Sequence, residues 1–307
     1  MPLRAIVAPL AAALAAALLA ACGSGGGDAR GDRAAASVVA TTTQVADLAR
    51  AVAGRRATVR QILQPSSDPH DYEPRPSDVA AVAGADIVLR SGGDVDEWLD
   101  GVLRNAGSDA GTVTLLDAAV RRRESDPHWW HDPRNAIAAV ERIRDALVAA
   151  DPAGRATYAA NAAAYVGRLR RLDDAIAACM RAIPEDRRKL VTDHDALGYF
   201  ADRYGIEVVG TVIPSRSTQA QASAGEVARL ARTIRSAGVE TIFPESSGSP
   251  KLTRAIAREA GARVGPALYA DTLGEAGGPG DTYLKSLVFN ARALAAGFGG
   301  DPDRCRP

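Results

Sequence analysis

Residues 153–183 carry one uninterrupted helical pattern that divides the chain into two parts of similar length. The apolar side chains of this segment recur at steps of three, four or seven residues, namely Tyr158, Tyr165, Leu169, Leu172, Ile176, Cys179 and Ile183. This spacing puts them on one face of an amphipathic helix, which at 1.5 Å per residue would be about 40 Å long. We expect so long a helix to join two folded units rigidly.

On both sides of this helix, strand patterns alternate with helical patterns, which include VDEWLDGVLRNA before it and HDALGYFADRYG after it. The strand patterns read SVVAT, ATVRQIL, ADIVLR and TVTLL before it, and KLVT, IEVVGTVI, VETIF and VGPAL after it. Alternation of this kind predicts mostly parallel sheets flanked by helices. We therefore expect an α/β protein of two domains, residues 37–150 and 184–307, joined by a linking helix within residues 151–183.

The first 36 residues predict attachment to a membrane. A positive head, MPLR, precedes an Ala-rich apolar run, and LAAC at residues 19–22 fits the cleavage site of a secretory lipoprotein signal. Cleavage would leave Cys22 as a lipidated N-terminus, followed by a flexible tether at residues 23–36. The alternative is a plain membrane anchor, for which an apolar run of about 17 residues is marginal. The prediction is an extracytoplasmic protein held on the cell membrane.

Two cysteines remain if Cys22 carries the lipid. In an oxidising compartment, Cys179 and Cys305 either form a disulfide that attaches the C-terminal tail to the middle of the chain, or stay unpaired thiols. The basic and acidic residues balance at 37 each. A formal net charge of zero gives no indication of a nucleic-acid partner.

The four histidines of the chain all lie close to aspartates. His70, His128, His131 and His194 occur in DPHDYEP, SDPHWWHDP and VTDHDALGY. A carboxylate near an imidazole can accept its second N–H and fix the tautomer for metal binding, although a lone surface histidine is usually only solvated. His70 and His194 follow predicted strands, and the sheet-end loops of α/β proteins gather ligands. These side chains could therefore converge in a cleft between the two domains.

The order of these segments resembles the metal-binding solute-binding lipoproteins of zinc and manganese ABC importers. The resemblance runs through VVATTTQVADLARAVAG, DPHDYEPRPSDVAAVAGADIV, DPHWWHDPRN, TDHDALGYFADRYG and LYADTLGEAGGPGDTYLKSLVFNARAL. It implies four metal ligands in the interdomain cleft, His70 and His128 from the first domain and His194 and Asp271 from the second. It also implies delivery to an ABC permease rather than enzymatic activity. The expected state is a monomer with one metal ion per chain.

Zinc is the predicted metal. Three imidazoles and one carboxylate suit tetrahedral Zn²⁺, whereas Mn²⁺ prefers more oxygen ligands. In the family's manganese branch a carboxylate tends to stand at the position of His194. The His-rich loop of many zinc members is missing here, where the sequence reads RRRESDP.

Other functions remain as alternatives. The nearest is an importer component for manganese or iron. A secreted zinc hydrolase and a surface adhesin are the others, although the chain contains neither HExxH nor GxSxG.

Several neighbours of the ligands receive interpretations of their own. His131 precedes a helix start at Asp132-Pro133 and is interpreted as a peripheral or packing residue, with a role in metal binding as the alternative. Trp129 and Trp130 are expected to pack at the floor of the cleft or as ordinary core.

Further interpretations concern the loops. Glu73 and Glu245 are candidate acceptors beside the ligands, with solvated or structural roles as the alternative. Arg121–Arg123 are expected to form a solvated loop. The Gly-rich stretch after Asp271 predicts that Asp271 is the mobile ligand during release.

Overall fold

A computed structural model describes residues 35–307 of the chain. The predicted signal segment, Cys22 and most of the tether lie outside the described residues. Among residues 35–307, no helix combines the length and the apolar character needed to cross a membrane.

The first half is built on a parallel four-stranded sheet in the order β2-β1-β3-β4. Its strands are β1 (Ala36–Ala40), β2 (Ala57–Gln61), β3 (Ile87–Arg90) and β4 (Gly111–Thr114). The central strands β1 and β3 are almost wholly buried, whereas the edge strands are partly exposed. Burial of this kind belongs to parallel sheets covered on both faces.

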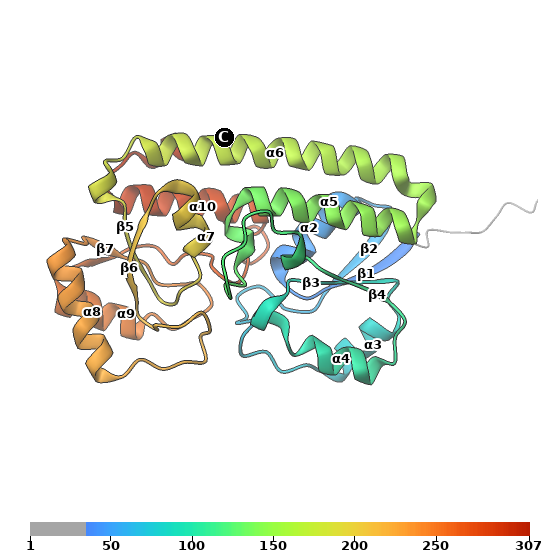
Figure 1. Cartoon of the computed structure of the whole chain (residues 1–307), viewed down its shortest axis with the longest axis horizontal. Helices are drawn as coiled ribbons and strands as arrows, with labels where there is room; N and C mark the ends of the chain where they lie inside the picture. The colour runs from blue at the N-terminus through green and yellow to red at the C-terminus, as the bar shows by residue number, and fades with distance from the viewer. Residues whose placement is uncertain (1–34) are drawn as a thin grey trace, which may run out of the picture. The chain divides into compact units, whose positions relative to one another are not determined.

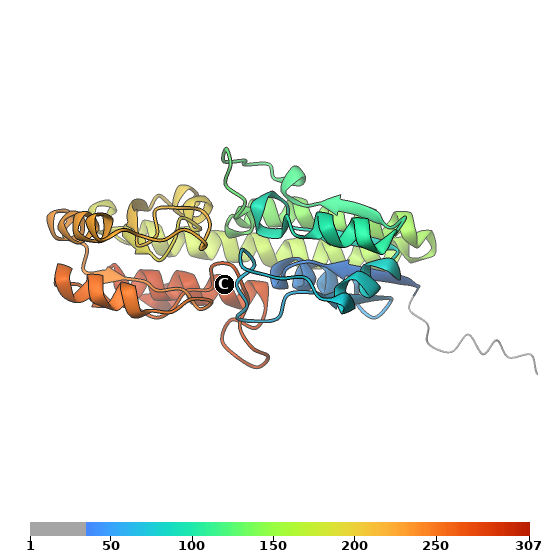
Figure 2. The same ribbon diagram turned by 90° about the horizontal axis from the view of Figure 1, so that it is seen from below.

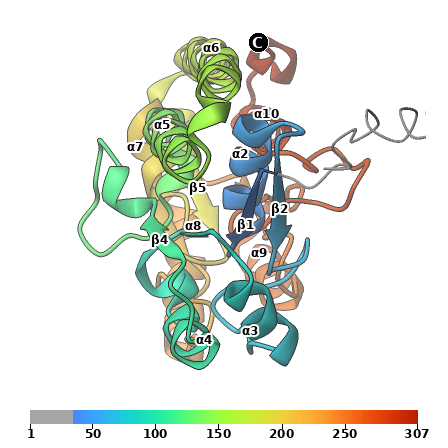
Figure 3. The same cartoon turned by 90° about the vertical axis from the view of Figure 1, so that its right-hand side faces the viewer.

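Helices cover both faces of this sheet (Figure 3). α2 (Thr43–Ala53) and α5 (Pro133–Ala150) lie on one face, and α3 (Pro76–Ala83) and α4 (Leu99–Ala106) lie on the other. α5 begins as predicted, because the Asp132 side chain accepts the N–H of Arg134 and caps the helix. The helix predicted around VDEWLDGVLRNA is divided, since a 3-10 turn at Gly93–Asp96 precedes α4.

The second half repeats this strand order in a looser form. Its strands are β5 (Lys189–Thr192), β6 (Glu207–Thr211), β7 (Thr241–Ile242) and β8 (Arg263–Val264). β5 pairs with β6 and β7 pairs with β8, all parallel, and a bridge between Thr192 and Phe243 connects the two pairs. The strand predicted at VGPAL is shorter than expected because Pro266 has no N–H to continue the ladder.

The helices of the second half are α7 (Gly198–Tyr204), α8 (Ala224–Ala237), α9 (Lys251–Ala260) and α10 (Tyr283–Gly297). Residues 194–197 were predicted to be helical, but α7 begins only at Gly198. His194 therefore lies in a loop directly after β5. Short 3-10 turns occupy Leu116–Ala118, Trp129–His131, Pro152–Gly154, Glu185–Arg187 and Pro302–Cys305.

α6 (Arg155–Arg181) is the predicted linking helix, and it runs along both halves (Figures 1 and 2). Every apolar residue of its predicted stripe is buried. The expectation of two α/β domains joined by one long helix is confirmed. The domain boundaries at residues 150 and 184 stay predictions.

A disulfide joins α6 to the C-terminal turn. It links Cys179 to Cys305, 126 residues apart in sequence, with their Cα atoms 4.9 Å apart. Of the two alternatives for these cysteines, the structure has the bonded one.

Candidate metal centre

Four loops at the carboxyl ends of strands bring His70, His128, His194 and Asp271 together. His70 lies between β2 and α3, and His128 lies between β4 and α5. His194 follows β5, and Asp271 lies between β8 and α10. Each half of the chain therefore supplies two of the four side chains. This is the edge at which parallel α/β sheets place their ligands.

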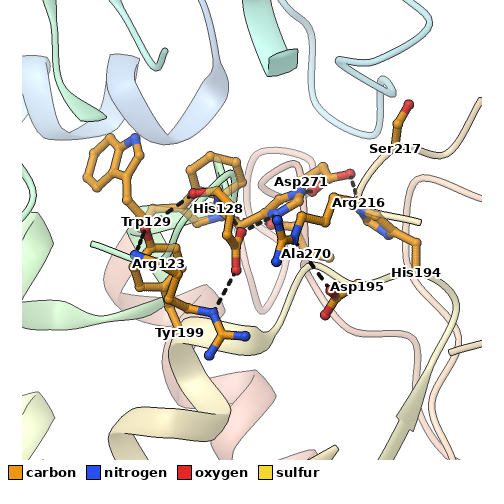
Figure 4. A network of polar contacts seen from close by, with 12 residues as sticks. Arg123, His128, Trp129, His194, Asp195, Tyr199, Arg216, Ser217, Ala270 and Asp271 are labelled. Atoms are coloured by element: carbon orange, nitrogen blue, oxygen red, sulfur yellow. Dashed lines mark hydrogen bonds and ion pairs between the residues drawn. The ribbon is translucent and has the colours of Figure 1, made fainter. Parts of the chain in front are cut away.

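The ligand atoms of these four residues all lie within 4.8 Å of one another. Asp271 is the centre of the group: the Nε2 atoms of His194, His128 and His70 lie 3.2, 3.4 and 3.7 Å from its carboxylate oxygens. All four side chains are at most 2 % exposed. In Figure 4 the side chains of His128, His194 and Asp271 point toward one another.

Among residues 35–307, the inward-facing atoms of this group have no hydrogen-bond partner. These are Nε2 of His70, His128 and His194 and both carboxylate oxygens of Asp271. Leaving one buried polar group unpaired costs about 1–3 kcal/mol, so five in one place need an explanation. A tetrahedral ion with ligands at about 2.0–2.1 Å has edges of about 3.3 Å, close to the spacings between these nitrogens and oxygens. The donor set therefore fits a divalent metal ion.

His128 is oriented by a carboxylate two residues before it. Its Nδ1 lies 2.9 Å from Oδ1 of Asp126, and its main-chain N–H donates to the same oxygen at 3.1 Å. Burial acts to raise the pKa of Asp126, but the hydrogen bonds and charge of His128 lower it. A carboxylate on Nδ1 leaves Nε2 free for a metal and increases the basicity of the ring.

His194 is oriented by Glu245, from the segment that follows β7. Oε2 of Glu245 lies 2.7 Å from Nδ1 of His194, and Oε1 accepts the main-chain N–H of His194 at 3.1 Å. Burial raises the pKa of Glu245. Burial also acts to lower the pKa of His194, but the charges of Glu245 and Asp271 outweigh it and hold that pKa well above 6.5.

His70 and Asp271 shift in pKa for different reasons. Burial lowers the pKa of His70 below 6.5. Burial acts to raise the pKa of Asp271, but the surrounding histidines, His194 first and then His128, lower it. The carboxylate is thus held ionised among the imidazoles, as a metal ligand must be.

The segment around Asp271 is fastened to the first half of the chain. The carbonyl of Ala270 accepts Nε1–H of Trp130 at 2.9 Å, and the N–H of Leu273 donates to Oγ1 of Thr43 at 2.9 Å. Mobility of Asp271 stays a prediction, and these hydrogen bonds argue against it.

The loop that carries His70 is also bonded to the second half. The carbonyl of His70 accepts a side-chain N–H of Gln219 at 2.5 Å, and the N–H of Ser66 donates to Oγ1 of Thr272 at 3.1 Å. His70 is the most exposed of the four, at 8 % of the whole residue.

A cavity of about 210 Å³ lies beside this group. Its lining includes His194 and the carboxylates of Asp68, Asp193 and Glu245. The acidic lining gives the cavity a negative potential that suits an approaching cation.

Aromatic side chains close the buried side of the group. The Trp130 ring lies 5.3 Å from the His128 ring, and Trp129 is fully buried with Nε1 on Ser91. His131 is also buried, 5.7 Å from the Trp130 ring, and its ring nitrogens have no hydrogen-bond partner in the part of the chain that the structure describes. Burial lowers the pKa of His131 to about 3, so it packs there as a neutral ring.

The structure agrees with some of the remaining sequence interpretations and contradicts one of them. Glu245 contacts a candidate ligand, whereas Glu73 is exposed. Arg121 and Arg122 are exposed as expected, but the solvated-loop prediction is wrong for Arg123, which is half-buried and bonds to Asp126. Sequence reasoning did not single out Asp126 as a partner of a ligand, although the SDPH motif placed it beside His128.

Known proteins resemble the chain over most of its length. The family model described as "Zinc-uptake complex component A periplasmic" matches residues 38–297. The iron-binding protein YfeA of Yersinia pestis is 33% identical over 269 residues, which cover 85% of this chain and 86% of YfeA. The manganese-binding lipoprotein MntA of Halalkalibacterium halodurans is 30% identical over 265 residues, covering 85% and 88%.

Solved structures agree with this picture. The periplasmic zinc binding protein TroA from Treponema pallidum superposes with a TM-score of 0.80 at 27% identity, covering 86% of this chain and 99% of TroA. A Cd-bound periplasmic metal binding protein from Candidatus Liberibacter asiaticus reaches a TM-score of 0.78 at 25% identity, covering 86% and 99%.

Proposed function

The chain belongs to the periplasmic metal-binding receptors of ABC importers, in the family described as zinc-uptake complex component A, and from this premise we propose that its cargo is Zn²⁺. The receptor would capture one ion between its two halves and deliver it to a membrane permease. A family described as part of an uptake complex favours this role over a secreted hydrolase. The adhesin alternative stays a prediction.

The observation that carries the proposal is the set of unpaired donors at the centre. Three imidazole nitrogens and one carboxylate face one point in a buried pocket. Nitrogen-rich sets of this size suit Zn²⁺, and first-row divalent ions bind such sites more tightly toward the end of the series, with zinc above manganese and iron. His70, His128, His194 and Asp271 are the proposed ligands.

Manganese or iron is the second candidate, and one detail favours it. Both oxygens of Asp271 are unpaired, and each lies within 3.4 Å of a histidine nitrogen. If both oxygens bound the ion, the set would become three nitrogens and two oxygens, and Mn²⁺ and Fe²⁺ accept such higher coordination numbers more readily than structural zinc does. The relatives named for iron and manganese fit this reading.

Attachment to the membrane is the remaining part of the proposal. The lipoprotein signal predicted at residues 1–22 would leave the receptor anchored through Cys22 outside the cytoplasm. One relative, MntA of Halalkalibacterium halodurans, is named as a lipoprotein, which supports this location.

A competition experiment tests the cargo. The full-length chain is stripped with a chelator, offered equimolar zinc, manganese and iron(II) under anaerobic conditions, and analysed for bound metal. We expect one zinc per chain, and its loss or marked weakening in His194→Ala. His131→Ala is the matched control, because His131 is a buried imidazole outside the ligand group, and it should keep the zinc.

Two other results would change the conclusion. Preferential binding of manganese or iron would overturn the choice of zinc and leave the receptor intact. The absence of any tightly bound metal would overturn the assignment of the site.

A further inference from the structure

Residues 123–126 of the first half are hydrogen-bonded to two elements of the second half (Figure 4). The hydroxyl of Tyr199, in α7, donates to the carbonyl of Asp126 at 3.2 Å and accepts the N–H of Arg123 at 2.9 Å. Arg216, in the loop after β6, donates to the carbonyl of Glu124 at 2.9 Å. This short segment is therefore a junction between the two halves, placed just before His128.

Arg123 is the side chain that makes contact on both sides of this junction. Its Nε donates to Oδ2 of Asp126 at 3.0 Å, and its NH1 nitrogen pairs with the carboxylate of Asp202 in α7. Asp126 is fully buried, and its other oxygen holds the ring of His128. One guanidinium thus connects the carboxylate behind a proposed ligand to a helix of the opposite half.

The first turn of α7 is shaped to receive this guanidinium. A Cβ added to Gly198 would lie 2.8 Å from three of the Arg123 guanidinium atoms, so a larger residue there would displace the guanidinium from this position. The Tyr199 ring lies beside the same group, with its centroid 6.0 Å from the guanidinium carbon. Because α7 begins four residues after His194, the contact also lies close to a ligand of the second half.

We propose that Arg123 is a positioning residue that holds the two halves closed around the bound ion by bonding Asp126 and Asp202 at once, and so slows release of the ion. This inference rests on the proposed metal site. Separation of the halves would break the bond to Asp202 and the contacts with Gly198 and Tyr199. The bond to Asp126 would remain, since both residues belong to the first half.

Burial distinguishes this arrangement from an ordinary surface ion pair. An exposed pair contributes little because water screens it, and the Asp202 side chain is 64 % exposed. Asp126 is fully buried, however, and a buried carboxylate depends on its partners to remain charged. Loss of Arg123 should therefore have a larger effect than loss of Asp202.

The test measures how fast zinc leaves the full-length chain. Zinc-loaded protein is mixed with an excess of a chromogenic chelator in a stopped-flow instrument, and zinc association is measured separately. We expect Arg123→Gln to release zinc about tenfold faster and Asp202→Asn about two- to threefold faster, as expected for a charge-assisted bond and an exposed pair respectively. Association rates should stay within about twofold of the wild type, because most changes in affinity lie in dissociation.

A double mutant distinguishes this positioning role from general loosening of the structure. Arg123→Gln with Asp202→Asn should release zinc no faster than Arg123→Gln alone, since Asp202 acts only through Arg123. Arg123→Lys, which keeps the charge but not the fork of donors, should lie between Arg123→Gln and the wild type. Arg122→Gln is the matched control, because the Arg122 side chain is 59 % exposed and its partner Asp117 lies at the surface.

Three results would overturn the inference. These are a release rate for Arg123→Gln equal to that of Arg122→Gln, additive effects in the double mutant, or a change confined to the association rate. If Arg123→Gln does not fold, the zinc release rate of the exposed variant Asp202→Asn is compared with that of the control Arg122→Gln. Equal release rates then overturn the inference. A wild-type chain that holds no metal would instead overturn the proposed function, so the two failures can be told apart.

Discussion

The two histidine–carboxylate pairs of the metal centre are alike in geometry and different in origin. In each pair, the carboxylate lies within 2.9 Å of the histidine Nδ1 and also accepts a hydrogen bond from that histidine's main chain, through one oxygen of Asp126 and through both oxygens of Glu245. Asp126 comes from two residues before His128, whereas Glu245 comes from 51 residues after His194. The same ligand orientation is therefore reached once by a local turn and once by the packing of neighbouring strands.

The pairs also differ in what compensates the carboxylate. Besides His128, Asp126 has the guanidinium of Arg123 as a partner, and its pKa is lowered. Glu245 is buried next to Asp193 and Asp271, and its pKa is raised. Its compensating charge is that of His194, whose own pKa is raised. The pair in the second half therefore depends on its histidine more strongly than the pair in the first.

Removal of either histidine should have the largest effect on zinc affinity. The loss should be similar for the two halves. We expect His128→Ala and His194→Ala each to weaken zinc binding by more than about 100-fold, above the 10–100-fold typical for a residue that only supports a ligand. Competition with a chelator of known affinity measures both constants. A loss of less than tenfold for either variant would remove that histidine from the ligand set.

Removal of the supporting carboxylates should weaken zinc binding to different extents in the two halves. Glu245→Gln is expected to weaken zinc binding by about 10–100-fold, or about 1.4–2.7 kcal/mol, and Asp126→Asn by less. The reason is that Arg123 still supports the local turn around residue 126, whereas His194 has no other side-chain partner on Nδ1. The same chelator competition, with Glu73→Gln as an exposed control, measures the difference. Equal losses would contradict the comparison.

The pH dependence of zinc affinity should be determined mainly by the pair of His194 and Glu245. His194 has a raised pKa, so its protonated form persists to a higher pH than that of an ordinary histidine and competes with zinc for the ring. Affinity should therefore fall as the pH falls from 8 to 6, by up to about tenfold per unit for one proton. Glu245→Gln should flatten this slope, because the raised pKa of His194 rests on that carboxylate. Isothermal titration in two buffers of different ionisation heat counts the protons released, and an unchanged count in Glu245→Gln would contradict the prediction.

The smallest effect on zinc affinity should come from substitution of His131, which belongs to neither pair. Its pKa is about 3 in the folded chain and about 6.5 when unfolded, so the unfolded state binds a proton more readily between these values. Stability of the metal-free protein should thus decrease as the pH falls from 6.5 toward 3, by up to about 1.4 kcal/mol per unit from this residue. His131→Leu should remove that part of the loss and leave zinc affinity unchanged. Urea unfolding at pH 7 and pH 5 compares the variant with the wild type, and parallel losses in both would refute it.

The fold was largely predictable because it depends on periodic patterns. The stripe on α6 and the Asp132 cap of α5 are local features, and both appear where the sequence indicates. The start of α7 and the end of β8 were misjudged, since they depend on the contacts of His194 with Glu245 and on a proline.

The candidate site was predictable only in part. The convergence of His70, His128, His194 and Asp271 was anticipated through resemblance rather than through spacing. Arg123 was misread because RRRESDP looks like a solvated run of charges. Its burial is created by Gly198 and Tyr199, about 75 residues away, and no local pattern reports such a contact.

The division of the four donors between the halves of the chain has a consequence for biogenesis. A nascent chain that has emerged only as far as α6 carries His70 and His128 but neither of the other two donors. Two imidazoles without their partners bind zinc weakly compared with the complete set. The complete set of donors therefore assembles only after the second half of the chain has folded against the first.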